Sequence, residues 1–299
     1  MSQSAPIKPL QAWTLAARPR TLPAAVAPVL IATALAFHDG VLYLPAALAC
    51  LLVSLLMQIG ANFANDLFDD QRGADTQARL GPTRASASGL LSAGQMRMGM
   101  LVVFGLAALL GIALVIRGGW PVIVVGIIII LAALAYSGGP FPYGYYALGD
   151  VFVLLSFGGI AVCGTYYAQA LNLPAAVYWV SMPIGLLIVN ILVVNNTRDM
   201  RTDQEAHKHT LAVLLGRRMM LFEYLACLGG AYLIPLGLWI AGLGSAGALL
   251  SWFSLPEAIR LFREFSSSEG SALNKTLGRT AQLAFIYALL YSLGVILVK

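Results

Sequence analysis

The chain has 299 residues, of which 59% are hydrophobic and only 10% are charged, whereas ordinary soluble domains are roughly 45–50% apolar and about 25% charged. This composition excludes a secreted disulfide scaffold, a disordered chain and a typical nucleic-acid-binding domain, and it predicts a protein with several membrane spans. The formal net charge of +5 therefore needs an explanation other than nucleic-acid binding, and no nucleic-acid partner is expected.

Nine apolar stretches have the length that a bilayer requires of a helix, about 17–25 residues. Their apolar residues occupy all faces, as in helices that lie in lipid and satisfy their backbone polar groups internally. The eighth stretch is interrupted by Gly244, Gly247 and Pro256. The sequence predicts an all-α membrane protein with nine transmembrane helices and with its termini on opposite sides of the membrane. In chain order the stretches are 20–37, 42–64, 97–116, 120–136, 147–169, 174–194, 219–241, 243–259 and 280–298.

The Lys and Arg residues in the connections indicate the orientation of the chain, because cytoplasmic loops are enriched in them. With nine helices, only Arg117 and Lys299 fall on one side of the membrane. The other 16 fall in the N-terminal tail and in the connections after the second, fourth, sixth and eighth stretches. This distribution predicts a cytoplasmic N-terminus, and it attributes the net positive charge to orientation and to contact with anionic lipid.

The first stretch has an alternative interpretation as a cleaved signal peptide. Arg18 and Arg20 precede an apolar run that contains the small-residue pattern Ala34-Leu35-Ala36, which resembles a cleavage site. However, Pro23 and Pro28 interrupt the run. We therefore interpret the stretch as the first membrane span.

Seven of the 13 acidic residues lie in two short segments that follow the second and sixth stretches. If the second helix continues through the first segment, Asp66 and Asp69 lie one turn apart on one face, with Asn62 a turn earlier. Asp70 follows Asp66 by four residues, so either Asp69 or Asp70 completes the pair. The polar residues of this segment are Asn62, Asn65, Asp66, Asp69, Asp70 and Asp75.

In the second segment Asp199 and Asp203 are separated by four residues and share a helical face. Neighbouring carboxylates repel each other unless a cation lies between them, and Mg²⁺ is commonly held by one or two carboxylates together with phosphate oxygens and water. Basic residues, which suit phosphate oxygens, are interleaved with the acids in both segments. The pattern is typical of a site for a metal-bridged diphosphate. The polar residues of the second segment include Asn195, Asn196, Asp199, Asp203 and Glu205.

Both segments follow the same order: an apolar helix, Asn residues, a spaced pair of Asp and then basic residues. The repetition predicts a single domain, 1–299, with a pseudo-repeat of 20–136 and 147–259 and a final helix at 280–298. The two acid pairs would then meet at one central cavity on the cytoplasmic side. Two alternatives are solvated juxtamembrane loops and a secondary transporter, although transporter repeats usually break their helices at the bilayer midplane.

The motifs NDxxDxxxxxD at 65–75 and DxxxD at 199–203 resemble the two aspartate motifs of the UbiA superfamily of intramembrane prenyltransferases. Five further stretches resemble the branch of that superfamily that prenylates 1,4-dihydroxy-2-naphthoate on the way to menaquinone. The pair Ala206-His207 departs from this branch, which often has a pair such as Asn-Gly before the Lys. The five stretches are 18–29, 79–92, 136–153, 164–169 and 195–216.

The resemblance implies nine helices around a central cavity, in an enzyme of the bacterial cytoplasmic membrane whose active site faces the cytoplasm. With Mg²⁺ as cofactor, the enzyme would transfer a prenyl group from a polyprenyl diphosphate to dihydroxynaphthoate, with loss of CO₂. Other branches prenylate 4-hydroxybenzoate, homogentisate or haem. The implied metal ligands are Asp66, Asp69, Asp199 and Asp203, with Asp75 as an auxiliary ligand. The implied diphosphate ligands are Asn65, Arg72, Arg198 and Lys208, and the polar residues near metal, phosphate or acceptor are Asn62, Asn195 and Asn196.

An allylic carbocation needs aromatic faces near it and protection from water. We expect Tyr136, at the cytoplasmic end of the fourth helix, to supply such a face. Tyr143, Tyr145 and Tyr146 flank a loop rich in Gly and Pro and are interpreted as an interfacial aromatic belt. Asp150, at the start of the fifth helix, is either a functional ionisable group that orients a cation or the acceptor or a first-turn acid.

Overall fold

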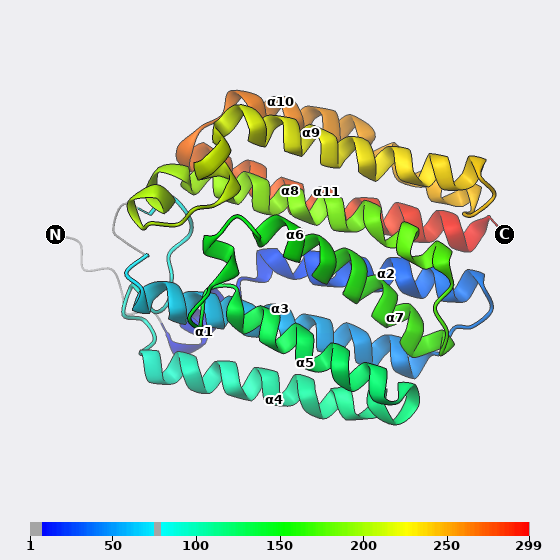
Figure 1. Ribbon diagram of the computed structural model, residues 1–299, viewed down its shortest axis with the longest axis horizontal. Coiled ribbons are helices and arrows are strands. Elements are labelled where there is room, and N and C mark those ends of the chain that lie inside the picture. The colour runs from blue at the N-terminus through cyan, green and yellow to red at the C-terminus, as the bar shows by residue number, and fades with distance from the viewer. Residues whose placement is uncertain (1–7, 75–78, 299) are drawn as a thin grey trace.

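We describe a computed structural model of the chain, which covers residues 8–74 and 79–298. Asp75, the predicted auxiliary ligand, lies outside the described residues. Within them all regular secondary structure is helical, and the long helices run side by side along one axis (Figure 1). The all-α prediction is therefore confirmed for this part of the chain.

The first half of the chain contains helices α1 to α5. The short α1 (Pro9–Ala17) and the 3₁₀ turn η1 (Pro19–Thr21) precede the longer helices α2 (Leu22–His38), α3 (Leu44–Gln71), α4 (Ala93–Gly118) and α5 (Trp120–Ala135). A proline lies in the first turn of α1, α2, α3 and α5. Proline is tolerated there because a backbone N–H in the first turn has no hydrogen-bond partner within the helix. Gly119, with φ of 73°, makes the one-residue turn between α4 and α5.

The second half begins with the 3₁₀ turn η2 (Tyr143–Tyr145) and a composite helix. This consists of α6 (Gly149–Val153), the π-helical segment η3 (Leu154–Ile160) and α7 (Ala161–Ala170). The helices α8 (Ala175–Glu205) and α9 (Leu211–Ile240) follow, and then the 3₁₀ segment η4 (Ala246–Ser254) with α10 (Leu255–Ser267). The 3₁₀ turn η5 (Gly270–Ala272) leads into α11 (Leu273–Leu297), which ends at the opposite end of the bundle from α1 (Figure 1).

Seven of the described helical segments are long and apolar enough to cross a membrane, and α5 is a shorter apolar helix. Each of the nine predicted stretches falls on a helical segment. The eighth corresponds to η4 and α10, and α10 carries Glu257, Arg260, Arg263 and Glu264. The structure thus shows seven candidate spans within residues 8–74 and 79–298, and the count of nine crossings stays a prediction.

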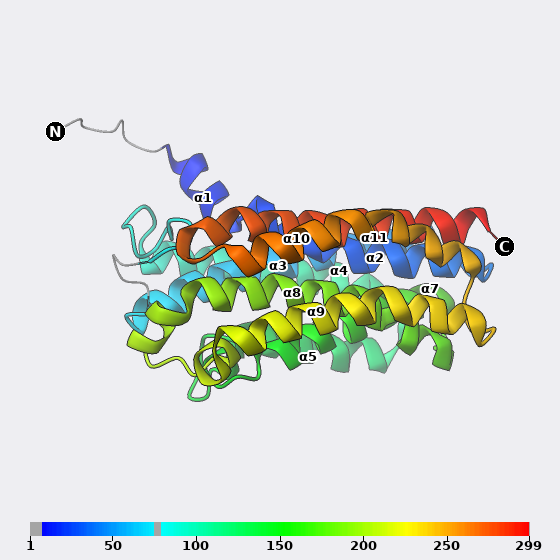
Figure 2. The same cartoon turned by 90° about the horizontal axis from the view of Figure 1, so that it is seen from above.

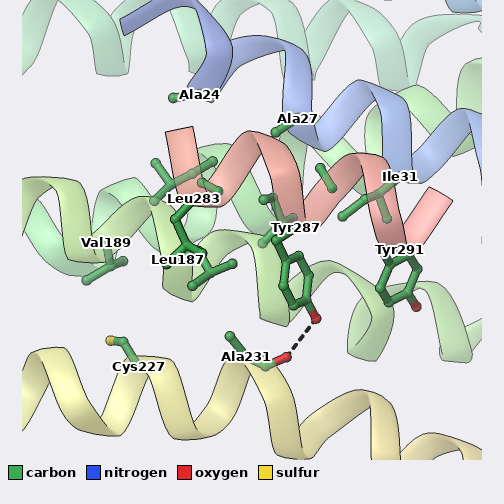
Figure 3. Close-up of a cluster of buried hydrophobic side chains, with 14 of the residues drawn as sticks. Ala24, Ala27, Ile31, Leu187, Val189, Cys227, Ala231, Leu283, Tyr287 and Tyr291 are labelled. Atoms are coloured by element: carbon green, nitrogen blue, oxygen red, sulfur yellow. Dashed lines mark hydrogen bonds between the residues drawn. The ribbon is translucent and has the colours of Figure 1, made fainter. Parts of the chain in front are cut away.

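The main core lies where α2, α8, α9 and α11 pack together (Figure 3). Ile31, Leu187 and Leu283 are fully enclosed there. Tyr287 is also buried, and its hydroxyl donates to the carbonyl oxygen of Ala231 at 2.7 Å, so this polar group on α11 is satisfied by the backbone of α9. A smaller core joins α1 to α3 and α4, and α1 projects to one side of the bundle in Figure 2.

Two glycines allow η4 and α11 to approach each other at backbone distance. A Cβ atom built on Gly294 would overlap the carbonyl oxygen of Gly247, so neither residue has space for a side chain. We predict that Gly294→Ala forces the two segments apart and lowers the free energy of unfolding by ~1–3 kcal/mol, as overpacking does. Thermal unfolding of the detergent-solubilised protein measures the change.

Gly278→Ala, on the same helix, is the matched control because nothing lies within 4 Å of a Cβ atom at that position. It should leave the stability unchanged or raise it slightly, since alanine favours a helix interior over glycine by roughly 0.5–1 kcal/mol. Equal melting temperatures for the two variants would contradict the close approach.

Candidate active site at one end of the bundle

The two acidic segments lie at the same end of the bundle. α3 continues through Gln71 and α8 through Glu205, so both Asp pairs stand on the last turns of long helices. The connections after α3, after α5 and after α8 gather around these helix ends (Figure 1). Segments far apart in the sequence therefore contribute side chains to one region.

Asp66 and Asp69 share the buried face of α3. Their exposed fractions are 1% and 3%, whereas Asp70 is half-buried and accepts a hydrogen bond from the hydroxyl of Ser86. The helix thus directs Asp69 and not Asp70 to the face that Asp66 occupies. The spacing left the choice between the two residues open, and burial on the face of Asp66 favours Asp69.

The loop after α3 covers these carboxylates. The backbone N–H of Ala85 donates to Oδ2 of Asp66 at 3.0 Å, and Nη2 of Arg84 lies 3.1 Å from Oδ2 of Asp69. Ala85 is fully enclosed and Arg84 is nearly so. This loop therefore presents one peptide N–H and one guanidinium to the acids of α3.

Two other loops reach the second oxygen of Asp69. The hydroxyl of Tyr145, in the connection after α5, donates to Oδ1 at 2.8 Å. The ammonium of Lys208, in the connection after α8, lies 3.4 Å from the same oxygen and 4.5 Å from the centre of the Tyr145 ring. The N–H of His209 donates to the carbonyl oxygen of Tyr145 at 2.8 Å, so the two loops are also joined through their backbones.

Asp199 is held mainly by its own neighbour. Nε of Arg198 donates to Oδ1 of Asp199 at 2.8 Å, and Nη2 bonds to Oδ2. Nη2 also donates to Asn195 and Nη1 donates to Asn274, each at 2.9 Å. Arg198 is 3% exposed, and its nitrogens are directed to protein partners. This arrangement orients the Asp199 carboxylate and occupies Arg198 with protein partners, and its predicted contact with the diphosphate stays a prediction.

Asp203, one turn further along α8, lies within electrostatic range of Asp69, Asp199 and Lys208. Its backbone carbonyl accepts from the N–H of Lys208 at 2.8 Å, which closes the end of the helix. The structure thus brings the acids of both segments to one site, with Lys208 between them.

The remaining predicted residues take different positions. The Arg72 guanidinium donates to the backbone carbonyl groups of Ser137 and Gly139 and lies 5.6 Å from the centre of the Tyr145 ring, and its role at the diphosphate stays a prediction. The Asn62 amide donates to the Ala17 carbonyl and to Thr21, which ties α3 to the start of the chain. The Asn65 side chain accepts from the hydroxyl of Ser137.

Tyr136 and Asp150 lie beside the acids, and Asn196 is buried on α8. Tyr136 is within electrostatic range of Asp69, Asp150 and Asp203. Asp150 is buried in the first turn of α6, which fits both of its earlier interpretations.

The aromatic-belt interpretation is wrong for Tyr143 and Tyr145, which are each only 8% exposed. Burial raises the pKa of Tyr143 to about 12, so its hydroxyl stays protonated and donates to the carbonyl oxygen of Ala132 at 2.9 Å. The N–H of Gly144 donates to the carbonyl oxygen of Tyr136 at 3.0 Å, which folds this loop back onto the end of α5. Tyr146 is 45% exposed and stacks on Phe141, as a belt residue would.

Three residues at the site were not assigned to it from the sequence: Arg84, Tyr145 and Asn274. The stretch 79–92, which contains Arg84, was recognised only as a resemblance. Nothing in the spacing around Asn274 relates it to residues near 80 or 198, because their proximity depends on how the last helix packs. Only the three-dimensional arrangement could identify it.

A cavity of about 1110 Å³ extends from this end along the bundle. Its volume is slightly above the roughly 300–1,000 Å³ that is usual for small-molecule pockets. Asn62, Asn65 and Tyr136 line its polar end. The rest of the wall comes almost entirely from apolar residues of α3, α4, α5, η3, α7 and the start of α8. The shape suits a molecule with a polar head and a long apolar tail.

Among the described carboxylates of the site, Asp69 and Asp199 are paired with side-chain cations. Within residues 8–74 and 79–298, no three His, Cys, Asp or Glu side chains converge closely enough to enclose a metal ion. Asp66 nevertheless has a buried oxygen, Oδ1, without a hydrogen-bond partner. A buried carboxylate oxygen is costly to leave unpaired, and an oxygen of this kind is the ligand that Mg²⁺ prefers, so Asp66 fits a metal-binding role.

Comparison with known proteins gives consistent matches over almost the whole chain. The model of the UbiA prenyltransferase family matches residues 25–296. The 1,4-dihydroxy-2-naphthoate octaprenyltransferase of Escherichia coli (strain K12) is 35% identical, with 96% of each chain covered. The protein of the same name from Mycobacterium tuberculosis is 40% identical, over 73% of this chain and 75% of its own. A UbiA homolog from Archaeoglobus fulgidus bound to DMAPP and Mg²⁺ has the same fold, with a TM-score of 0.62 at 15% identity, covering 94% of this chain and 99% of its own.

The pairing of Arg198 with Asp199 yields a stability prediction. Asp199→Ala would remove the carboxylate that accepts two hydrogen bonds from the buried Arg198 guanidinium. Breaking a buried ion pair in this way typically costs about 3–5 kcal/mol. We expect the free energy of unfolding to fall by about that amount, whereas Asp199→Asn, which keeps one oxygen acceptor, should lose less. Thermal or denaturant unfolding of both variants tests this, and a loss of stability in Asp199→Asn equal to that in Asp199→Ala would contradict it.

Proposed function

The chain belongs to the UbiA prenyltransferase family, and on this premise we propose that it transfers a polyprenyl group from an allylic polyprenyl diphosphate to 1,4-dihydroxy-2-naphthoate. The observation that carries the proposal is the meeting of two carboxylate pairs with Arg84 and Lys208 beside Tyr136, which lines the polar end of a long apolar cavity. Several relatives that match most of the chain bear the name of this activity. Among aromatic acceptors, their names favour dihydroxynaphthoate over 4-hydroxybenzoate or homogentisate.

The cavity and the carboxylate site divide the donor substrate between them. The prenyl tail occupies the apolar length of the cavity, where burial of its hydrocarbon surface supplies binding free energy. The diphosphate lies at the polar end, where Asn65 and Tyr136 line the wall. This division places the bond that breaks at the boundary between the two regions.

Lys208 and Arg84 bind the diphosphate. Both lie against Asp69, and both are cations whose hydrogen bonds to phosphate oxygens are charge-assisted. Because Arg198 and Arg72 are committed to protein partners, we assign them structural roles and not the diphosphate contact first expected from the sequence.

Asp66, Asp69, Asp199 and Asp203 would hold Mg²⁺, with the unpaired Oδ1 of Asp66 as the best-supported ligand atom. When bound, Mg²⁺ neutralises the negative charge that develops on the departing diphosphate. The carboxylates balance the charge of Lys208 and Arg84 when no substrate is present.

The reaction then requires a protected cation and an electron-rich ring. The carbon–oxygen bond of the allylic diphosphate breaks and its electron pair leaves with the diphosphate. A new carbon–carbon bond forms to the naphthoate ring, and the carboxyl group leaves as CO₂. Tyr136 presents its ring to the cavity and stabilises the allylic cation, while Tyr143 and Phe152, stacked at 4.1 Å between ring centres, keep water out of the polar end.

We further infer that the protein crosses the membrane of a bacterial cell nine times, with the N-terminus and the carboxylate site in the cytoplasm. The distribution of Lys and Arg supports this orientation, as do the seven long apolar helices, the shorter α5 and the position of η4 with α10 alongside α11. A secondary transporter is less well supported, because the carboxylates lie at the ends of α3 and α8 and not near their middles.

Turnover by the purified protein tests the function. We expect the enzyme with Mg²⁺, a polyprenyl diphosphate and dihydroxynaphthoate to release diphosphate and CO₂ and to form a prenylated naphthalene, all detectable by mass spectrometry and ¹⁴CO₂ release. Excess EDTA should abolish the reaction. A panel containing 4-hydroxybenzoate and homogentisate identifies the acceptor, and failure to prenylate any of the three acceptors would exclude the proposed function.

Substitution of the adjacent acids tests the site. Asp69→Asn removes the charge that Arg84 and Lys208 share and should lower kcat/KM by about 10²–10³, the usual effect of removing one preorganised electrostatic contact. Asp70→Asn is the matched control, because Asp70 is the adjacent acid and its hydrogen bond comes from the Ser86 hydroxyl and not from Arg84 or Lys208. It should lower kcat/KM less than about tenfold. A larger loss for Asp70→Asn than for Asp69→Asn would overturn the assignment.

A further inference from the structure

Asn274 connects two segments that flank the carboxylate site. It lies in the first turn of α11, and its side-chain amide makes two hydrogen bonds. Oδ1 accepts from Nη1 of Arg198 at 2.9 Å, and Nδ2 donates to the carbonyl oxygen of Leu80 at 2.8 Å. One side chain thus bridges the end of α8 and the loop after α3.

We propose that Asn274 is a positioning residue that sets the geometry of both carboxylate pairs for the proposed prenyl transfer. On the α8 side it acts through Arg198. The guanidinium is planar and rigid, and its other bonds go to Asp199 and Asn195. Fixing Nη1 therefore fixes the plane of the guanidinium and, through it, the orientation of the Asp199 carboxylate.

On the loop side Asn274 acts through Leu80. The next residue, Gly81, passes directly over the guanidinium, since a Cβ atom there would lie 2.8 Å from Nη2 of Arg198. A side chain at residue 81 would require the Arg198 guanidinium to shift. Holding the Leu80 carbonyl fixes the start of the loop segment that carries Arg84 to Asp69 and the Ala85 N–H to Asp66.

Asn suits this position better than related residues do. Its amide has one acceptor and one donor group, which are the two functions that Arg198 and the Leu80 carbonyl require. Aspartate keeps the acceptor but lacks the donor, so it would retain the Arg198 contact and lose the loop. Alanine removes both contacts. Comparing the two substitutions therefore separates the effect of the Leu80 contact from that of the Arg198 contact.

The kinetic test compares Asn274→Asp and Asn274→Ala with Lys275→Ala, a matched control because Lys275 is exposed on the same helical turn. We expect KM for the prenyl diphosphate to rise about tenfold or more in Asn274→Ala and by a smaller factor in Asn274→Asp, as expected when hydrogen bonds to or near charged groups are lost. Lys275→Ala should keep the wild-type KM. A wild-type KM in both Asn274 variants would overturn the proposal, whether or not kcat falls in them.

A second test does not depend on prenyl transfer and separates this inference from the proposed function. Limited trypsin digestion, followed by mass spectrometry, compares cleavage after Arg79 and Arg84 with cleavage after Arg201, whose side chain is 89% exposed. In the wild type, inorganic pyrophosphate with Mg²⁺ should slow cleavage after Arg79 and Arg84 relative to Arg201. In Asn274→Asp, which keeps the Arg198 contact and so the fold, this protection should be lost.

The two experiments distinguish failure of the proposed function from failure of the positioning role. If the wild type prenylates no aromatic acceptor but the protection by pyrophosphate depends on Asn274, the proposed function fails and the positioning role stands. If Asn274→Asp shows wild-type protection, Asn274 does not hold the loop and the inference is wrong, whatever the activity of the enzyme.

Discussion

The arrangement of the active end of the bundle depends on the buried carboxylate of Asp69. A carboxylate that is shielded from water is costly unless cations or hydrogen-bond donors surround it. Here the donors come from three separate connections: Arg84 from the loop after α3, Tyr145 from the loop after α5 and Lys208 from the loop after α8. Each loop is irregular, and each is placed by the requirement that this carboxylate be satisfied. The polar end of the cavity therefore has a defined shape before any ligand binds.

The carboxylate end of the bundle is polar, whereas the rest of the cavity wall carries few polar groups. The chain has few charged residues, and the cavity wall beyond Asn62 and Asn65 is almost wholly apolar. The apolar wall suits hydrocarbon, whereas the cations Arg84 and Lys208 lie where the three loops meet. This separation fits the division of a prenyl diphosphate into tail and head, and it follows from where the long helices end.

Much of this architecture could be predicted from the sequence because its determinants are local. Apolar length located the long helices, and the spacing of Asp66 and Asp69 and of Asp199 and Asp203 indicated two helical faces. What could not be predicted depends on packing between distant segments. The commitment of Arg198 to Asp199, the binding of Arg72 to backbone carbonyls and the burial of Tyr145 are decided by which partner a long side chain reaches. The predicted pseudo-repeat likewise contains no signal that its two halves meet through a residue of the final helix.

The position of Asn274 has a consequence for the order in which the protein is completed. Its partner Leu80 lies 194 residues earlier in the chain, and a protein made from its N-terminus folds its early segments first. The helices that carry all four assigned carboxylates are therefore synthesised before the residue that ties their ends together. A chain that stops short of α11 would contain every acid of the site but would lack the bridge between them. Only when the last helix is in place does the bridge between the two halves of the site exist.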